Sequence, residues 1–198
     1  MAVKLRNELS ESKNFGAVRV TPDLSANSDL YIKAKILKSN GEDVEMKVTV
    51  IDSTGKSWIK GKKYKHRVTS FLFDNPRNKD ADGKLKVDPY QPIYRKINSD
   101  LASYLRKRIN ASKTEVIHTT AEIRFAQDFS PGAFSDILRE KRGKYTLKGR
   151  PAPDDPMMKR VQNIQYRDAM FIDTMQTHYD SFYSEMKPNY SVWQQEGY

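Results

Sequence analysis

The chain has 198 residues, a length that suits one domain or one domain with a helical extension. It contains no cysteine, which excludes disulfides, thiolate metal sites and cysteine nucleophiles. Its 35 basic side chains exceed its 25 acidic ones, and the net charge of +10 would suit nucleic acid, an anionic membrane surface or an acidic protein as a partner.

Two placements in the cell stay open from the sequence. No run of 18 apolar residues occurs, so we expect no membrane-spanning segment. Residues 1–15 lack the apolar centre of a signal peptide. The protein is therefore either cytoplasmic, with Met1 as its natural start, or an exported protein whose leader lies upstream of this sequence.

The first elements expected are a short amphipathic helix over residues 3–13 and a short strand over Ala17–Val20. Leu5 and Leu9 are apolar positions of the helix, with charged residues between them. A polar loop over residues 21–28 follows, because proline, asparagine and hydroxyl side chains gather there.

Residues 28–68 carry the clearest strand pattern of the chain. Apolar and polar residues alternate in two segments, with the apolar positions at Leu30, Ile32, Ala34 and Ile36 and then at Val44, Met46, Val48 and Val50. Asn40-Gly41 and residues 52–55 have the composition of tight turns. The third strand, Ser57–Val68, alternates less cleanly, and Gly61 is expected to mark a bulge. This pattern predicts an antiparallel sheet with one apolar and one basic face.

A helix over residues 89–109 is expected to cover the apolar face. Its apolar positions recur every four residues, at Ile93, Ile97, Leu101, Leu105 and Ile109. Val116–Ala126 is then expected to be a strand or an extended connection. Ser130-Pro131 has the signature of a helix start, and this helix is expected to run to about Lys141.

The last part of the chain predicts an extended linker, RPAPDDP, over residues 150–156. Asp155-Pro156 then starts a helix of about thirty residues, which we expect Pro188 to end. The predicted fold is α+β: a three- to four-stranded antiparallel meander covered by helices, plus a long C-terminal helix. We expect a sheet domain over residues 1–150 and a helical arm with an aromatic tail over residues 151–198.

No catalytic or metal-binding pattern is present, so we expect a non-enzymatic protein without a cofactor. His66, His118 and His178 lie far apart in the sequence. No P-loop, G-x-S-x-G or dinucleotide-binding pattern occurs. A hydrolase that combines carboxylates from distant segments stays open as an alternative.

One loop matches the front of a calcium-binding loop, through Asn78, Asp80, Asp82, Gly83 and Leu85. Pro89 stands where such a loop needs its bidentate glutamate. Since the strongest ligand is missing, we favour a plain solvated turn over residues 78–88 and predict no metal site.

A nucleic-acid site could form on the third strand. Basic side chains gather there around two aromatic ones, at Trp58, Lys60, Lys62, Lys63, Tyr64, Lys65 and Arg67. Such a strand could follow a phosphate backbone and stack bases. The alternative is an edge strand whose lysines prevent edge-to-edge aggregation, and we favour it.

The long C-terminal helix and tail carry a candidate protein-binding face. Its aromatic and methionine residues are Phe171, Met175, Tyr179, Phe182, Tyr183, Tyr190 and Trp193. The alternative is an ordinary core stripe. We favour a binding face, because the helix is too long to be buried fully on a small sheet.

The segment from Leu5 to Tyr64 resembles a class of bacterial cell-envelope domains. The resemblance rests on LRNELSESKNFGAVRV and SDLYIKAKILKSNGEDVEMKVTVIDSTGKSWIKGKKY, where a helix leads into a short strand and then into a hairpin. It is similar to the small α/β domain of periplasmic lipoproteins, such as the curli-secretion lipoprotein and transporter auxiliary lipoproteins, and of TolB-type N-terminal domains.

This resemblance implies a periplasmic, outer-membrane-associated protein whose signal peptide and lipidated cysteine precede the present sequence. It also implies a part in assembling envelope complexes. The leading hypothesis is therefore a non-enzymatic accessory or scaffold protein of the cell envelope, which binds other proteins through its C-terminal helix and tail. Its basic surface would face peptidoglycan, lipid headgroups or an acidic partner. The alternative is a cytoplasmic nucleic-acid-binding module that uses residues 57–68.

Overall fold

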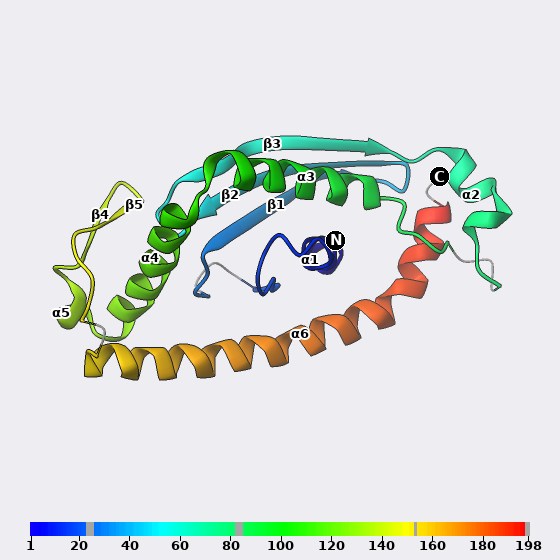
Figure 1. Cartoon of the computed structure of the whole chain (residues 1–198). Coiled ribbons are helices and arrows are strands. Elements are labelled where there is room, and N and C mark those ends of the chain that lie inside the picture. Colours follow the sequence, from blue (N-terminus) through cyan, green and yellow to red (C-terminus); the bar gives the residue numbers. More distant parts are fainter. Residues whose placement is uncertain (23–25, 82–84, 153, 197–198) are drawn as a thin grey trace.

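The computed structural model shows an α+β protein, so the predicted fold class is confirmed (Figure 1). The structure describes residues 1–22, 26–81, 85–152 and 154–196. Within these residues the chain forms a three-stranded antiparallel sheet, a separate two-stranded sheet and a long C-terminal helix.

The main sheet has the order β1-β2-β3 and contains β1 (Leu30–Ser39), β2 (Asp43–Asp52) and β3 (Ser57–Arg67). Gly41 and Gly55 lie in the two turns, with φ angles of +89° and +81°. Such angles are open to glycine at little cost, which explains why both turns contain one.

The strand β3 changes register at Gly61, as the sequence predicts. Gly61 has a φ angle of +58°, and the pairing with β2 shifts between Val48 and Val50. A Cβ atom at Gly61 would lie 2.7 Å from the Cε atom of Lys47. The missing side chain therefore leaves room for Lys47 to cross the strand.

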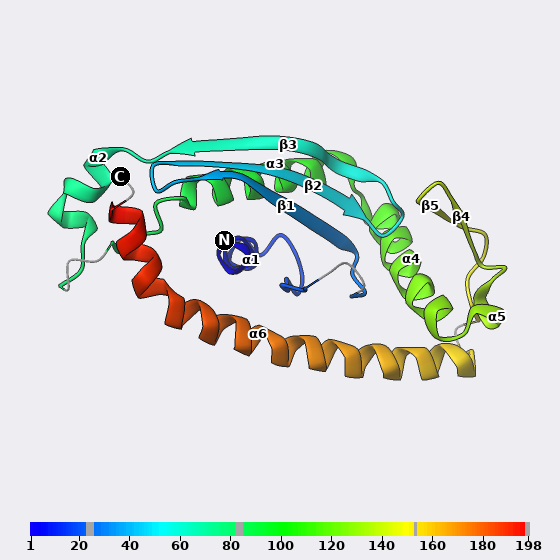
Figure 2. The same ribbon diagram turned by 180° about the vertical axis from the view of Figure 1, so that it is seen from behind.

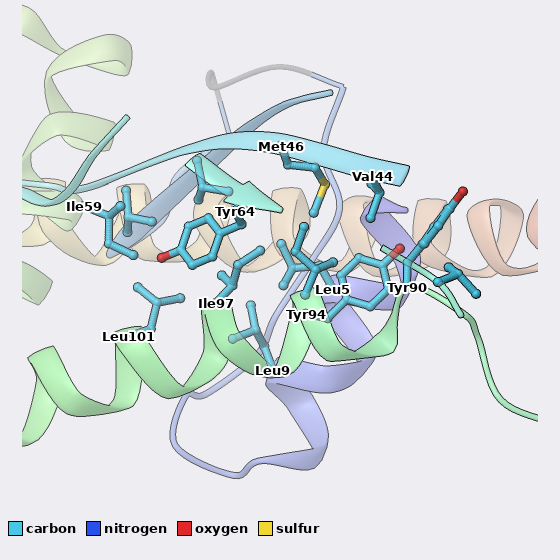
Figure 3. Packing of buried hydrophobic residues seen from close by; sticks show 14 of the residues in the cluster. Leu5, Leu9, Val44, Met46, Ile59, Tyr64, Tyr90, Tyr94, Ile97 and Leu101 are labelled. Atoms are coloured by element: carbon cyan, nitrogen blue, oxygen red, sulfur yellow. The ribbon is translucent and has the colours of Figure 1, made fainter. Parts of the chain in front are cut away.

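Two helices cover the apolar face of β2 and β3: α1 (Ala2–Glu11) and α3 (Gln91–Arg108) (Figure 3). Both helices follow the expected apolar periodicity, and α3 buries Ile93, Ile97 and Leu101 against the sheet. The side chains that fill this first cluster include Leu5, Leu9, Val44, Met46, Val48, Val50, Ile59, Tyr64, Tyr90 and Tyr94.

The two faces of the sheet differ sharply. No described helix lies on the basic face (Figures 1 and 2). On the apolar face the helices cover β2 and β3 better than β1, where Ile36 is 50% exposed although it pairs with the buried Met46. The edge strand β1 is therefore only partly covered.

The expected strand over residues 116–126 is wrong. Instead α4 (Ala111–Phe129) is a continuous helix, whose start is capped by the Asn110 side chain accepting a hydrogen bond from the Lys113 N–H group. Four of the five residues at 116–120 are β-branched, which disfavours a helix locally. The burial of one face of α4, including Ile117, Ala121 and Ile123, outweighs this preference.

The expected helix to Lys141 is also wrong beyond its first turn. The helix α5 (Pro131–Phe134) is followed by a hairpin of β4 (Leu138–Lys141) and β5 (Lys144–Leu147). Its two loop residues, Arg142 and Gly143, both have positive φ angles, as in a type I′ turn. An arginine in that conformation gives no clear turn signal in the sequence.

Two shorter expectations have different outcomes. Ala17–Val20 belong to no strand, so that prediction is wrong. The calcium-like segment follows α2 (Ser70–Asp74) and begins at Asn78, the last residue of the short 3-10 helix η1 (Pro76–Asn78). Its residues 82–84, with Asp82 and Gly83, lie outside the described part of the chain. In the described part of that segment, the Asn78 side chain donates to the carbonyl of Leu72 at 3.1 Å.

The last element, α6, runs from Pro156 to Glu196 without a break, so the expected end at Pro188 is wrong. Proline removes one helical hydrogen bond and bends a helix more often than it ends it when packing holds the following turn. Tyr190 supplies that packing, because it lies against the first hydrophobic cluster. The last part of α6 turns toward α2 and the chain before α3 (Figures 1 and 2).

A second hydrophobic cluster joins α4, α5, β4 and the start of α6, through Ile123, Phe125, Ala126, Phe134, Leu138, Met158 and Val161. The helix α6 thus contributes side chains to both clusters. The expected division of the chain near residue 150 stays a prediction.

Candidate protein-binding surface

The sequence before α6 sets where this helix begins. The Asp155 carboxylate accepts hydrogen bonds from the backbone N–H groups of Met157 and Met158, at 2.7 and 3.3 Å. Pro156 occupies the first helical position, where its missing N–H group costs nothing. With 41 residues, α6 is about 60 Å long at 1.5 Å per residue.

One face of α6 is held against the rest of the protein near its middle. The side-chain amide of Gln176 donates to the carbonyl of Val20 and accepts from the Val20 N–H group, both at 2.8 Å. Arg6 of α1 donates to the Asp180 carboxylate and, at 3.4 Å, to Gln176. The backbone of the segment after α1 therefore binds α6. Its N–H and carbonyl groups, which pair with no strand, find their hydrogen-bond partners in the Gln176 side chain.

A second ion pair lies on the same side. Arg19 donates two hydrogen bonds to the two oxygens of Asp173, at 2.6 and 2.8 Å. These bonds lower the pKa of the Asp173 carboxyl against a weaker opposing effect of burial, and they raise the pKa of Arg19. The Asp173 side chain is 56% exposed and Arg19 is partly exposed, so this contact orients α6 more than it stabilises the fold.

The end of α6 is held by aromatic side chains. Tyr190 packs on the first hydrophobic cluster, and the Lys4 ammonium lies 5.0 Å from the ring centre of Tyr183. Together with Met158 and Val161 at its start, these contacts fix α6 at its start, its middle and its end.

A different face of α6 carries apolar residues that are exposed, except for the half-buried Met175. They are spaced seven and four residues apart in turn, at Ile164, Phe171, Met175, Phe182, Met186 and Trp193, and we name them the α6 stripe. Phe171 and Phe182 are 66% and 63% exposed. The intervals of seven and four residues add up to a repeat of eleven, which is close to three full turns of an α-helix. The stripe therefore runs nearly straight along α6.

The structure divides the seven residues that the sequence predicts as a binding face. Phe171, Met175, Phe182 and Trp193 belong to the α6 stripe, and the half-buried Tyr179 lies at its edge. Tyr183 and Tyr190 lie on the inner face, in the contacts with Lys4 and the core.

Two members of the α6 stripe are not in the predicted set: Ile164, which is 37% exposed, and Met186, which is 47% exposed. The signal that could have found them is the repeated spacing of seven and four residues. The predicted set does not use this spacing, so it leaves out both residues.

The candidate nucleic-acid face on β3 has its aromatic rings engaged. Trp58 stacks on Tyr104 of α3 with ring centres 4.9 Å apart, and its indole N–H donates to Asp52. Tyr64 is 1% exposed and donates its hydroxyl to Asp100 at 2.6 Å. Burial and this carboxylate raise the pKa of Tyr64. Tyr64 is therefore not free to stack on a base, and Tyr104 already occupies one face of the Trp58 ring.

Most basic side chains of β3 also have acidic partners. Lys62 pairs with Asp100 at 2.6 Å, and both Lys63 and Lys65 pair with Glu45. Arg67 donates to both oxygens of Asp43, and these bonds, with that of Lys38, hold the Asp43 pKa well below its usual range. Lys60 is exposed and has no acidic partner among the described residues.

Exposed lysines also lie on the other two strands, where the sequence predicts the basic face. Lys33 and Lys35 of β1 and Lys47 of β2 point away from the apolar face, because they alternate with its residues. In the described chain none of the three forms an ion pair. The uncompensated positive charge of the sheet therefore lies mainly on β1 and β2.

The described residues offer little that suggests a small-molecule site. No three histidine, aspartate or glutamate side chains among them gather as metal ligands. A hollow of about 160 Å³ between α1 and residues 86–91 is lined by both signs of charge, including Lys4, Glu8, Lys86 and Asp88. Drug-sized ligands usually occupy about 300 Å³ or more.

Comparison with family models, curated proteins and solved structures finds no match for this chain. None of the helices in the part of the chain that the structure describes is long and apolar enough to cross a membrane.

Proposed function

We propose that this is a non-enzymatic accessory or scaffold protein that binds another protein through the α6 stripe. The observation that carries the proposal is the exposure of Phe171 and Phe182, at 66% and 63%. The helix that bears them is already held against the rest of the protein by another face, which includes Gln176. Apolar patches of this kind on soluble proteins are commonly interaction sites.

The fixed position of α6 supports the proposal. Ordering a flexible segment at the moment of binding weakens an interaction, whereas a surface held in place beforehand avoids that loss. The contacts of Asp173, Gln176 and Asp180 hold the middle of α6 without using any residue of the stripe. The aromatic and methionine side chains are therefore presented in a set geometry, which suits an amphipathic partner helix.

The cellular setting remains part of the proposal. The resemblance of residues 5–64 to periplasmic lipoproteins favours the cell envelope, with the lysine-bearing sheet face toward peptidoglycan, lipid headgroups or an acidic protein. Fractionation of the cells that naturally express the protein tests this directly. Recovery in the cytoplasm would contradict it.

A second candidate function, nucleic-acid binding, retains one favourable observation. Lys33, Lys35 and Lys47 form an exposed group without acidic partners among the described residues. The aromatic rings of β3 are already engaged, Trp58 by a stack on Tyr104 and Tyr64 by burial and its bond to Asp100, so we place this candidate second.

The proposal is tested with a photo-reactive amino acid placed at Phe171 or at Phe182 in cells. We expect cross-linked protein products from both positions. Tyr166 and Met170 are the matched controls, because they are 67% and 54% exposed on the same helix but lie outside the stripe. Absence of products from the stripe, or equal yields from the controls, would contradict the proposal.

A further inference from the structure

We infer that the α6 stripe binds the α6 stripe of a second copy of this chain, in an antiparallel arrangement. This inference rests on the proposed function, since it names the partner for the same surface. It is carried by three properties of the stripe: the symmetry of its spacing, the sizes of the residues that would meet, and the area that it exposes.

The spacing of the stripe reads the same in both directions. Its intervals are seven, four, seven, four and seven residues, from Ile164 to Trp193. If two such helices lie antiparallel, every stripe residue meets a stripe residue of the other copy. A two-fold axis then passes between His178 and Tyr179, which gives the closed, self-complementary contact of most homodimers.

The residues that meet are complementary in size only in the antiparallel arrangement. Phe171 meets Met186 of the second copy, and Met175 meets its Phe182. Each central layer therefore pairs one rigid ring with one flexible methionine, a favourable sulfur–aromatic contact. Ile164 meets Trp193 in the outer layer. In a parallel arrangement, rings would meet rings and methionines would meet methionines, which fills space less evenly.

The bend of α6 leaves the centre of this contact intact. The four central residues, Phe171, Met175, Phe182 and Met186, all precede Pro188. Only Trp193 lies beyond the proline. The eleven-residue repeat favours two nearly straight helices with a slight right-handed twist, so no strong supercoiling is required.

The exposed area is sufficient. From their exposed fractions, Phe171, Phe182 and Trp193 present roughly 250–420 Å² per copy, taking 150–250 Å² for a whole aromatic side chain. With Ile164, Met175, Met186 and the flanking side chains, two copies would bury on the order of 1,000 Å², the lower bound for a specific interface.

The flanks of the stripe add two equivalent charge pairs. Arg160 and Glu196 are exposed at opposite ends of α6, on the same side of the stripe. In the antiparallel dimer, Arg160 of each copy lies beside Glu196 of the other, whereas a parallel dimer would leave these two residues at opposite ends of the contact.

The mass in solution is the first test. We expect light scattering to give twice the chain mass of 22.9 kDa at micromolar concentration. Phe171→Glu combined with Phe182→Glu should raise the dissociation constant on the order of a hundredfold or more. Tyr166→Glu combined with Met170→Glu should leave it unchanged. Circular dichroism checks that both double variants fold, as expected for residues more than half exposed.

The orientation is tested by cysteine cross-linking. The chain has no cysteine of its own, so only the introduced thiols can react. His178→Cys should link to itself through a short bis-maleimide. Arg160→Cys and Glu196→Cys should each fail alone and should link when the two variants are mixed. Thr177→Cys, on another side of α6, is the control. Self-linking of Arg160→Cys and Glu196→Cys alone would overturn the antiparallel arrangement.

The remaining outcomes separate this inference from the proposed function. A monomer at all concentrations, with photo-cross-links from the stripe only to other proteins, overturns the inference and leaves the proposed function standing. A dimer that survives Phe171→Glu with Phe182→Glu also overturns the inference. A monomer without any stripe cross-links overturns both.

Discussion

Gln176 of α6 and Val20 form a reciprocal pair of hydrogen bonds in which a side-chain amide takes the place of a neighbouring strand. The Val20 N–H group donates to Gln176 Oε1 and the Gln176 Nε2 group donates to the Val20 carbonyl, both at 2.8 Å. A side chain 156 residues away in the sequence thus satisfies a backbone segment that the sequence predicts to be a strand.

Gln176→Ala should therefore loosen α6 and the segment before β1 together. Both backbone groups of Val20 lose their partner, so we expect the free energy of unfolding to fall by about 1–2 kcal/mol. Chemical denaturation measures this, and Thr177→Ala, at the next and exposed position, is the control. Hydrogen exchange at the Val20 amide should accelerate. Unchanged exchange would show that the amide pair does not hold α6.

The contact between Arg19 and Asp173 predicts that the stability of the protein depends on pH in the acidic range. The Asp173 pKa is lowered from about 3.8 by the hydrogen bonds from Arg19. A carboxyl whose pKa is lower in the folded state stabilises the protein above its unfolded pKa, and this contribution is lost as the pH falls. Wild type should be more stable than Asp173→Asn at pH 7, and the difference should vanish toward pH 2. Denaturation midpoints across this range test it, and a constant difference would contradict it.

The main sheet could be predicted from the sequence because its signals are local. Alternation over residues 30–36 and 44–50, with turns at Gly41 and Gly55, specifies strands and register without knowledge of the rest of the chain. The long helix after Asp155 could be predicted for the same reason: a cap, a first-position proline and no glycine.

The errors fall where packing between distant segments outweighs local preference. The β-branched residues of 116–120 favour a strand locally, yet α4 buries Ile117 and Thr120 as a helix. Pro188 signals a helix end, yet Tyr190 on the core keeps the next turns helical. The sequence predicts most residues of the candidate surface, but it does not show that Phe182 is exposed while Tyr183 faces the protein. The position of Tyr183 depends on its contact with Lys4 of α1, which lies far away in the sequence.

Gly55 makes a contact that no larger residue could make. It has a φ angle of +81°, and an added Cβ atom would lie only 1.9 Å from the carbonyl oxygen of Gly143 in the β4–β5 hairpin. The neighbouring Thr54 carbonyl accepts a hydrogen bond from the Tyr145 N–H group at 2.9 Å. The turn between β2 and β3 thus supports the hairpin directly.

Gly55→Ala should therefore destabilise the protein by about 1 kcal/mol or more from backbone strain alone, and should displace the hairpin. Thermal unfolding measures the first effect, and the Tyr145 amide resonance reports the second. Gly16→Ala is the control, because an added Cβ atom there meets nothing within 4 Å. An unchanged Tyr145 resonance in Gly55→Ala would argue against this contact.

Substitutions of Tyr190 and of Trp193 should have different effects on stability and on binding. Their rings stack 5.5 Å apart, but Tyr190 lies on the core and Trp193 is 40% exposed. Tyr190→Ala should lower the free energy of unfolding by about 2 kcal/mol, which is less than the roughly 3–5 kcal/mol typical of truncating a buried large ring, because the side chain is half-buried. Trp193→Ala should change stability little and weaken binding at the stripe. Equal losses of stability in both variants would place Trp193 in the core.

The lysines of the sheet should bind nucleic acid only weakly and without sequence preference. At physiological salt we expect no sub-micromolar affinity for DNA or RNA, because Tyr64 is buried and Trp58 already stacks on Tyr104. In addition, Glu45, Asp100 and Asp43 compensate most of the positive charge of β3. Fluorescence anisotropy across a salt series measures the affinity and the number of phosphates contacted.

Two sets of variants locate any binding that is found. Lys33→Glu, Lys35→Glu and Lys47→Glu together should abolish the weak binding, since these lysines have no acidic partner among the described residues. Lys62→Glu with Lys63→Glu should change it less, because each of these lysines is already paired. Sub-micromolar, strongly salt-dependent binding that the Lys62 and Lys63 variant destroys would favour the nucleic-acid function over the scaffold. The charge of β3 would then be functional, and the α6 stripe would need another explanation.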